Sequence, residues 1–134
     1  MVQTAQRAAQ KDPEILVRSR RVSPWRPRKE HVVETCERMI DIVAALFEIS
    51  GRELRERGRS NSSVSRVRQI AMYVAHVSLG LKMREVGYGF VRDRTTVMHA
   101  CHLVEDMRDD PEFDRMVLTV EKIAVAALLV REQA

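Results

Sequence analysis

The sequence has few aromatic residues, only two cysteines and no long apolar run. Aromatic residues make up 4% of its 134 residues, which argues against a sheet-rich fold that depends on aromatic cross-strand pairs. Cys36 and Cys101 each fall on the apolar stripe of an expected helix, so we predict small core residues in a reducing compartment and no disulfide framework. No apolar run could span a bilayer, and the N-terminus lacks the apolar segment of a signal peptide. We therefore expect a cytoplasmic protein with no membrane partner.

Motifs for catalysis, nucleotide binding and metal binding are also missing from the sequence. There is no G-x-x-x-x-G-K-[ST] phosphate loop and no recognisable Ser-His-Asp or Cys-His arrangement. His99 and His102 stand three residues apart, but no Cys-x-x-Cys or similar pair accompanies them as further ligands. We therefore predict a protein that is not an enzyme and needs no cofactor, metal or nucleotide.

The length and charge of the chain suit one small domain with a polyanionic partner. A chain of 134 residues, 45% of them hydrophobic, can form a single helical core. Its formal net charge of +4 makes DNA a plausible partner.

Residues 1–30 show no sustained apolar period and are predicted to form a flexible basic N-terminal arm. Between Ile15 and Lys29 there are six basic residues and no acidic one. Pro24 and Pro27 predict that no continuous helix forms there. Two interpretations remain open: a solvated tail, or an arm that follows the phosphate backbone or enters a minor groove. Trp25 could anchor the arm on the domain or on a partner.

Apolar periodicity predicts long helices over residues 31–49, 63–79 and 113–130. Ser50 is expected to cap a further short, basic helix with Leu54 as its buried residue. The last helix is apolar nearly all round towards its end, so packing on the domain and contact with a protein partner or a second copy both remain open. The apolar positions are Val32, Val33, Cys36, Met39, Ile40, Val43, Ala44 and Phe47, then Val67, Ile70, Ala71, Val74 and Ser78, and finally Phe113, Met116, Val117, Val120, Ile123, Ala124, Ala127 and Leu128.

The stretch from Arg92 to Met107 has the pattern of a groove-reading helix. Asp93 is a candidate N-cap, and its carboxylate could accept hydrogen bonds from the first turn. Val97, Ala100, Cys101, Val104 and Met107 form one apolar stripe, whereas Arg94, Thr95, Thr96 and His99 point elsewhere. Arg can pair with guanine, and Thr can contact a base edge or a thymine methyl. An ordinary surface helix with a polar start would look similar. Residues 82–90 upstream predict a short helix and a tight, Gly-containing turn, which completes a helix-turn-helix.

The motif R-D-R-T-T-V-M-H-A-C at residues 92–101 resembles the signature G-R-D-H-T-T-V-x-H-A of the bacterial replication initiator DnaA. That signature belongs to its C-terminal DNA-binding domain, domain IV. The resemblance continues in S-V-S-R-V-R-Q-I-A-M-Y-V-A at residues 63–75 and in M-R-E-V-G at residues 83–87, and spans roughly residues 32–120. It implies an all-α, Trp-repressor-like helix-turn-helix bundle over residues 31–134.

The resemblance also implies a set of DNA-binding residues. Base contacts are expected from Arg94, Thr95, Thr96 and Asp93, and phosphate contacts from Arg66, Arg68, Gln69, Lys82, Arg84 and Arg92. His99 would touch a phosphate or close the edge of the core. Arg59 is the one basic side chain left in a loop that the family uses in the minor groove, and the basic arm could substitute for it.

Two departures from the family pattern lie in or next to the residues that are expected to contact the bases. Arg94 replaces the usual His, and Phe90-Val91 leads into Arg92 with one residue fewer than usual. The preferred DNA site is therefore expected to differ from the initiator's box. The predicted function is sequence-specific binding of double-stranded DNA by a nucleoid-associated transcriptional regulator without ATPase activity. The alternatives are a replication accessory that competes for initiator boxes and a protein–protein adaptor with weak DNA contact.

Overall fold

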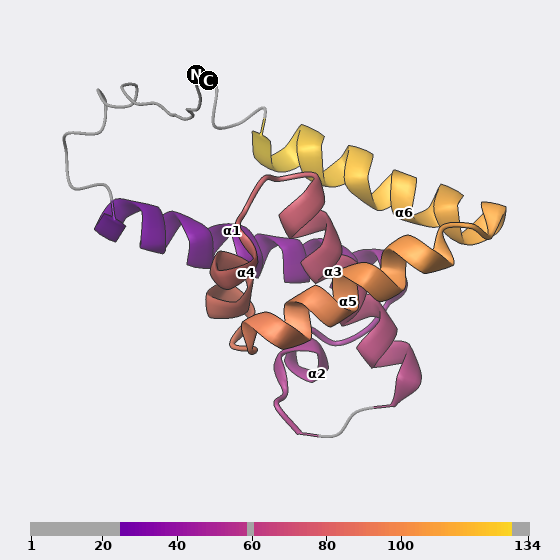
Figure 1. Cartoon of the computed structure of the whole chain (residues 1–134), viewed down its shortest axis with the longest axis horizontal. Helices are drawn as coiled ribbons and strands as arrows, with labels where there is room; N and C mark the ends of the chain where they lie inside the picture. Colours follow the sequence, from indigo (N-terminus) through magenta and orange to yellow (C-terminus); the bar gives the residue numbers. More distant parts are fainter. Residues whose placement is uncertain (1–24, 59–60, 130–134) are drawn as a thin grey trace, which may run out of the picture. The chain divides into compact units, whose positions relative to one another are not determined.

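The computed structural model of the chain describes residues 25–58 and 61–129, with side chains from Lys29 onward. Within these ranges the chain is helical and contains no strand (Figure 1), which confirms the predicted all-α fold. The helices are α1 (Trp25–Phe47), α2 (Gly51–Arg55), α3 (Ser62–Val77), α4 (Met83–Phe90), α5 (Arg94–Met107) and α6 (Pro111–Ala124), followed by a π-helical turn, η2 (Val125–Leu129). Among the described residues, no helix combines the length and the apolar character that crossing a bilayer would require.

The first helix begins earlier than its apolar period predicts. It starts at Trp25 and runs through Pro27, so the expectation that the prolines exclude a continuous helix there was wrong. Pro27 is the third residue of α1, where its missing N–H would have no intrahelical acceptor in any case. The compact unit that carries the rest of the fold comprises residues 32–134.

Local capping interactions fix where the next helices start. Ser50 caps α2, as predicted, by accepting from the Arg52 N–H at 3.1 Å. Asn61 caps α3 by accepting from the Val64 N–H at 2.9 Å, and Asp110 caps α6 by accepting from the Phe113 N–H at 3.0 Å. These side chains satisfy backbone donors that the first turn of a helix leaves without a partner.

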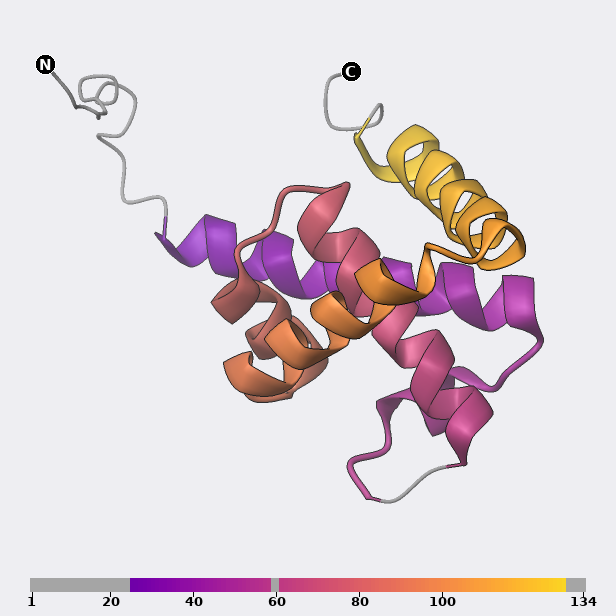
Figure 2. The ribbon, with the colours of Figure 1, turned by 45° about the vertical axis from the view of Figure 1, so that its right-hand side comes forward.

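The core of residues 32–134 forms where the apolar stripes of the long helices meet. Helix α5 crosses α3, and α4 packs against α5 (Figures 1 and 2). Most of the predicted stripe residues are buried, and both cysteines lie free within the core. Burial raises the pKa of the Cys36 thiol to about 12 and that of Cys101 to about 11. The core residues contributed by α3 and α5 are Val64, Val67, Ile70, Ala71, Met72, Tyr73, Val74, Ala75, Val97, Ala100, Cys101 and Val104.

Some predicted stripe positions face outward. Val33 and Ile123 are each 37% exposed, and Met107 is only half-buried at the end of α5. A helix stripe is wide enough to include such flanking positions, and the neighbouring helices decide which of them are covered.

The C-terminal helix packs on the domain through one face. Val117, Val120, Ala124 and Leu128 are buried, whereas Leu118 is exposed. Packing on the domain, one of the two roles left open, therefore accounts for the buried face of this helix.

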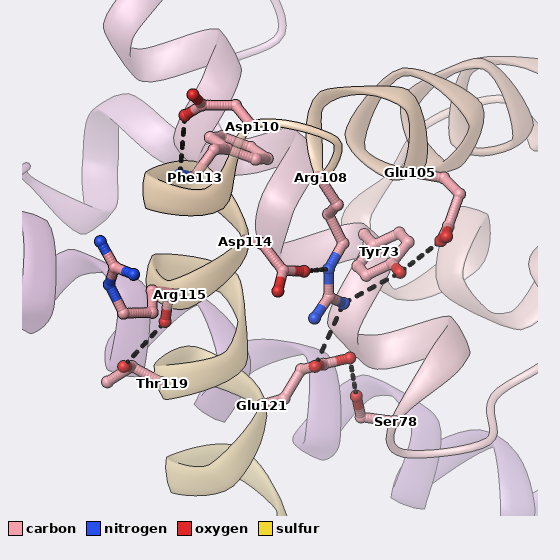
Figure 3. Close-up of polar contacts among 10 residues, drawn as sticks. All are labelled: Tyr73, Ser78, Glu105, Arg108, Asp110, Phe113, Asp114, Arg115, Thr119 and Glu121. Carbon is pink, nitrogen blue, oxygen red and sulfur yellow. Dashed lines mark hydrogen bonds and ion pairs between the residues drawn. The ribbon is translucent and has the colours of Figure 1, made fainter.

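A polar network centred on Arg108 joins α3, α5 and α6 (Figure 3). Its guanidinium donates to Asp114 at 2.5 Å, to Glu121 at 3.2 Å and to the Tyr73 hydroxyl at 3.1 Å. Its pKa lies above its ordinary value: burial lowers it, but the bonds to Asp114 and Tyr73 and the charge of Glu121 outweigh that loss. Because Arg108 follows the last residue of α5, the network ties the end of that helix to α6.

Candidate nucleic-acid interface

A tight turn joins α4 to α5 and completes a helix-turn-helix. The Arg92 N–H donates to the Gly87 carbonyl at 2.8 Å, which closes the end of α4 in the manner of a Schellman motif. A Cβ atom on Gly87 would lie 2.7 Å from the Arg92 carbonyl oxygen, so this close approach requires glycine. The angle between the two helices therefore depends on Gly87.

The residue that makes the turn is a valine. Val91 adopts φ 57° and ψ 52°, in the left-handed region where helix ends usually place glycine. This conformation costs about 1–2 kcal/mol for a residue with a Cβ atom, and a β-branched side chain rarely adopts it. The sequence had predicted a glycine-containing turn. Gly87 and Gly89 instead lie inside α4, and the short connection leaves Val91 as the left-handed residue.

The first turn of α5 presents polar side chains to solvent. Arg94, Thr95 and Thr96 are exposed, whereas Val97 and Ala100 on the other face are buried. Asp93 is the N-cap residue, as predicted, but its side chain accepts no capping hydrogen bond. The expected capping role of its carboxylate was therefore wrong. The first-turn N–H groups of α5 are consequently not satisfied by this side chain.

Two hollows flank this first turn, and Arg92 and Thr96 line both. The α4-side hollow has a volume of about 910 Å³ and is lined by Val33, Glu37, Arg57, Arg84, Gly87, Tyr88, Gly89, Val91, Arg92, Asp93, Arg94 and Thr96. The α3-side hollow has a volume of about 370 Å³ and is lined by Ser65, Arg68, Gln69, Met72, Arg92, Thr95, Thr96, His99 and Ala100. Most of the predicted DNA-binding residues thus surround the start of one helix.

Arg68 is held inside the fold and does not lie on the outer face that the sequence predicted. It is 8% exposed, and it donates to the Leu54 carbonyl at 2.9 Å and to the Glu53 carbonyl at 3.2 Å. These carbonyls belong to the last residues of the short helix α2, which has few intrahelical donors for them. Burial lowers the pKa of the Arg68 guanidinium. The side chain therefore joins α2 to α3, while it still lines the α3-side hollow.

Arg92 binds the segment after α2 in a similar way. Its guanidinium donates to the Glu56 carbonyl at 2.6 Å and to the Phe90 carbonyl at 3.1 Å. Burial lowers its pKa, and the positive charges of Arg68 and Arg57 lower it further. The Arg92 guanidinium is thus repelled by two neighbouring cations beside the first turn of α5, an arrangement that a bound anion would stabilise.

The other predicted phosphate-binding residues are not all brought together. Arg66 lies near the far end of α5, where its guanidinium contacts the Met107 sulfur at 2.7 Å, and it lines a separate hollow beside Phe47. Lys82 is exposed at the N-cap of α4. The buried Gln69 Oε1 atom has no hydrogen-bond partner among the described residues. Arg59 lies outside the described residues.

Three exposed residues beside the first turn of α5 were not singled out in the sequence. Arg57, Tyr88 and Val91 all line the α4-side hollow and are all exposed. Arg57 belongs to the basic segment after Ser50, so its charge could have drawn attention to it. Tyr88 and Val91 carry no charge, and only the folded turn places them beside Arg94.

Comparison with known proteins relates this fold to one family. A family model described as "Bacterial dnaA protein helix-turn-helix" matches residues 36–104. The chromosomal replication initiator protein DnaA of Lachnoclostridium phytofermentans is 33% identical over 92 residues, which are 66% of this chain and 20% of the relative. That of Desulfotalea psychrophila is 35% identical over 66 residues, which are 49% of this chain and 14% of the relative. The chain thus spans at most about a fifth of the length of these relatives.

Solved structures show the same similarity. A crystal structure of a DNA replication initiation factor has a TM-score of 0.69 at 25% identity, over 78% of this chain and 32% of that one. The replication initiator DnaA bound to AMPPCP and single-stranded DNA has a TM-score of 0.64 at 25% identity, over 75% of this chain and 30% of that one. The family match covers the helix-turn-helix described above and confirms the resemblance seen in the sequence. The chain therefore belongs to the family of the bacterial DnaA helix-turn-helix domain.

Proposed function

We propose that this chain binds double-stranded DNA in a sequence-specific manner, with the first turn of α5 in the major groove. The observation that carries the proposal is the exposure of Arg94, Thr95 and Thr96 on a helix whose opposite face is buried. A guanidinium can pair with guanine, and a threonine can contact a base edge or a thymine methyl. The N-terminal residues of the second helix are those that a helix-turn-helix presents to base edges.

The surrounding cations support the placement of the DNA backbone. Lys82 and Arg84 lie on or beside the start of α4, and Arg68 and Arg92 line the α3-side hollow. Gln69 and His99 line the same hollow, and we propose that they contact a phosphate there. Four cations on phosphates predict a log–log salt slope of binding of roughly −4. Arg66 is left out of this set because it lies at the other end of α5.

The cellular role that we propose is that of a transcriptional regulator that acts on the nucleoid in the cytoplasm and does no catalysis itself. The sequence contains no phosphate-loop motif for ATP, and the interface would need only a DNA duplex. A replication accessory that competes for initiator boxes is the second candidate, favoured by the names of the two relatives, which are replication initiators. Arg94 stands where the family usually has His, so we expect the preferred DNA sequence to differ from the initiator box. A different target sequence favours the regulator over a protein that competes for initiator boxes.

The test is selection of binding sites from a random duplex library by the wild-type chain and by an Arg94→Ala/Thr95→Ala variant. We expect the wild type to enrich one motif and the variant to bind without preference, at roughly 1–3 kcal/mol per lost base contact. Arg115→Ala/Thr119→Ala is the matched control, because it removes the same residue types from the exposed side of α6. The proposal fails if both double variants enrich the wild-type motif equally well.

Genome-wide recovery of crosslinked DNA separates the two cellular roles. Peaks at promoters that disappear in the Arg94→Ala/Thr95→Ala variant would support the regulator. Peaks confined to the origin and to initiator boxes would support the replication accessory.

A further inference from the structure

Val91 combines a strained backbone with an exposed side chain. It occupies the left-handed region at φ 57°, which glycine adopts without cost and which a β-branched residue rarely adopts. Val91 is 54% exposed, whereas Phe90, the residue before it, is 5% exposed. Burial in the core therefore does not offset the strain. Val91 is more exposed than covered, and glycine would adopt this backbone conformation more easily.

The exposed side chain of Val91 lies beside the reading head. It lines the α4-side hollow together with Arg94 and Thr96, and it precedes Arg94 by three positions in the chain. Arg57 and Arg84 line the same hollow, so a polyanion is the partner that the charge of the surface favours. Within this basic surface Val91 is an apolar group next to the first turn of α5.

We propose that Val91 is a specificity-determining residue that contacts the C5-methyl group of a thymine next to the bases read by Arg94. The inference rests on the proposed binding of double-stranded DNA. In the major groove the thymine methyl is the apolar feature of the base edges, and an aliphatic side chain is the group that recognises it. A guanidinium reads hydrogen-bond acceptors on the base edges, whereas Val91 offers an aliphatic group without a polar atom, so Val91 adds a kind of recognition that the charged residues do not supply.

The test removes the two partners of this contact separately. The probe is the duplex recovered from the random library by the wild-type chain, together with copies in which deoxyuridine replaces each thymine in turn. Uracil lacks only the methyl group, so it keeps every hydrogen bond of the base pair. For the wild type we expect one such replacement to weaken binding about fourfold, the factor for one methyl group removed from an apolar contact.

Each of the variants Val91→Gly and Val91→Ala should bind the thymine duplex and the duplex with uracil at the sensitive position with equal affinity. The two variants differ in stability, because glycine relieves the left-handed strain and alanine does not. A shared loss of methyl discrimination therefore cannot come from partial unfolding. Val77→Ala is the matched control, since Val77 is 50% exposed at the end of α3 and lines neither hollow. It should keep the fourfold penalty for uracil.

Two outcomes would overturn the inference in distinguishable ways. If the wild type selects a motif but both Val91 variants retain its full uracil penalty, Val91 does not read a methyl group and DNA binding itself still stands. If the wild type selects no motif, the proposed function fails and this inference fails with it.

Discussion

Replacing Arg108 by alanine should destabilise the fold by about 2–3 kcal/mol. The change would leave the carboxylates of Asp114 and Glu121 without the cation between them, and Tyr73 without a donor (Figure 3). Breaking one side of a buried ion pair costs about 3–5 kcal/mol, whereas exposed pairs contribute at most about 1 kcal/mol. The side chains of Arg108 and Glu121 are 17% and 15% exposed, but that of Asp114 is 44% exposed, so the expected loss lies between these limits.

Urea unfolding followed by far-UV circular dichroism measures this loss. With a slope typical of a small domain, the midpoint should fall by about 1–2 M urea. Arg115→Ala is the control, because Arg115 is an exposed residue of α6, the helix that carries Asp114 and Glu121, and its removal should change stability by less than about 0.5 kcal/mol. If Arg108→Ala lowers the midpoint no more than Arg115→Ala does, the network does not hold α6 to the end of α5.

Three further changes test other features of the chain. Gly87→Ala should lower the free energy of unfolding by about 1–3 kcal/mol, because the new Cβ atom would lie 2.7 Å from the Arg92 carbonyl oxygen. Thermal unfolding measures this loss. Gly58→Ala is the control and should be close to neutral, because nothing lies within 4 Å of its Cβ position. The free energy of unfolding should fall as the pH rises from about 9 to about 12, because folding raises the pKa of Cys36 from 9.0 to about 12. In that range the unfolded chain has lost the thiol proton, whereas the folded chain still keeps it. The loss is at most about 4 kcal/mol, and an equally steep decline in Cys36→Ala would contradict this assignment. Deletion of residues 1–24, the part of the predicted arm (residues 1–30) that lies outside the described residues, tests whether the arm contacts DNA. The deletion should weaken binding to all duplexes and flatten the salt slope, and an unchanged slope would show that this segment makes no phosphate contacts.

The buried and exposed faces of α5 could be predicted almost completely from the sequence. The spacing of Val97, Ala100, Cys101 and Val104 identified the buried face of α5, and all four are buried. The same spacing placed Arg94 and Thr95 in the exposed first turn. Such predictions succeed because helical periodicity is local: the angle between two side chains on one helix follows from their separation in the chain.

The neighbours of the helix faces could not be predicted in this way. The helical spacing predicts Arg66 and Arg68 on or near one outer face, but Arg66 lies beside Met107 and Arg68 reaches the carbonyls at the end of α2. Those carbonyl groups accept from Arg68 only because α2 is short and ends beside α3. Periodicity gives the direction in which a side chain points from the axis of its helix. It does not show which backbone groups of other segments lie in that direction.

The sequence by itself determined most of the helices, most of the core and which side chains stand in the exposed first turn of α5, because each follows from spacing within one segment or from a motif of consecutive residues. The tertiary structure alone decided which cations gather at the start of α5 and that Val91 makes the turn in a left-handed conformation. Those features depend on contacts between segments that are distant in the chain and on the short connection between α4 and α5. A connection of fixed length must close a fixed gap between two packed helices, and Val91 adopts the strained backbone that this closure requires.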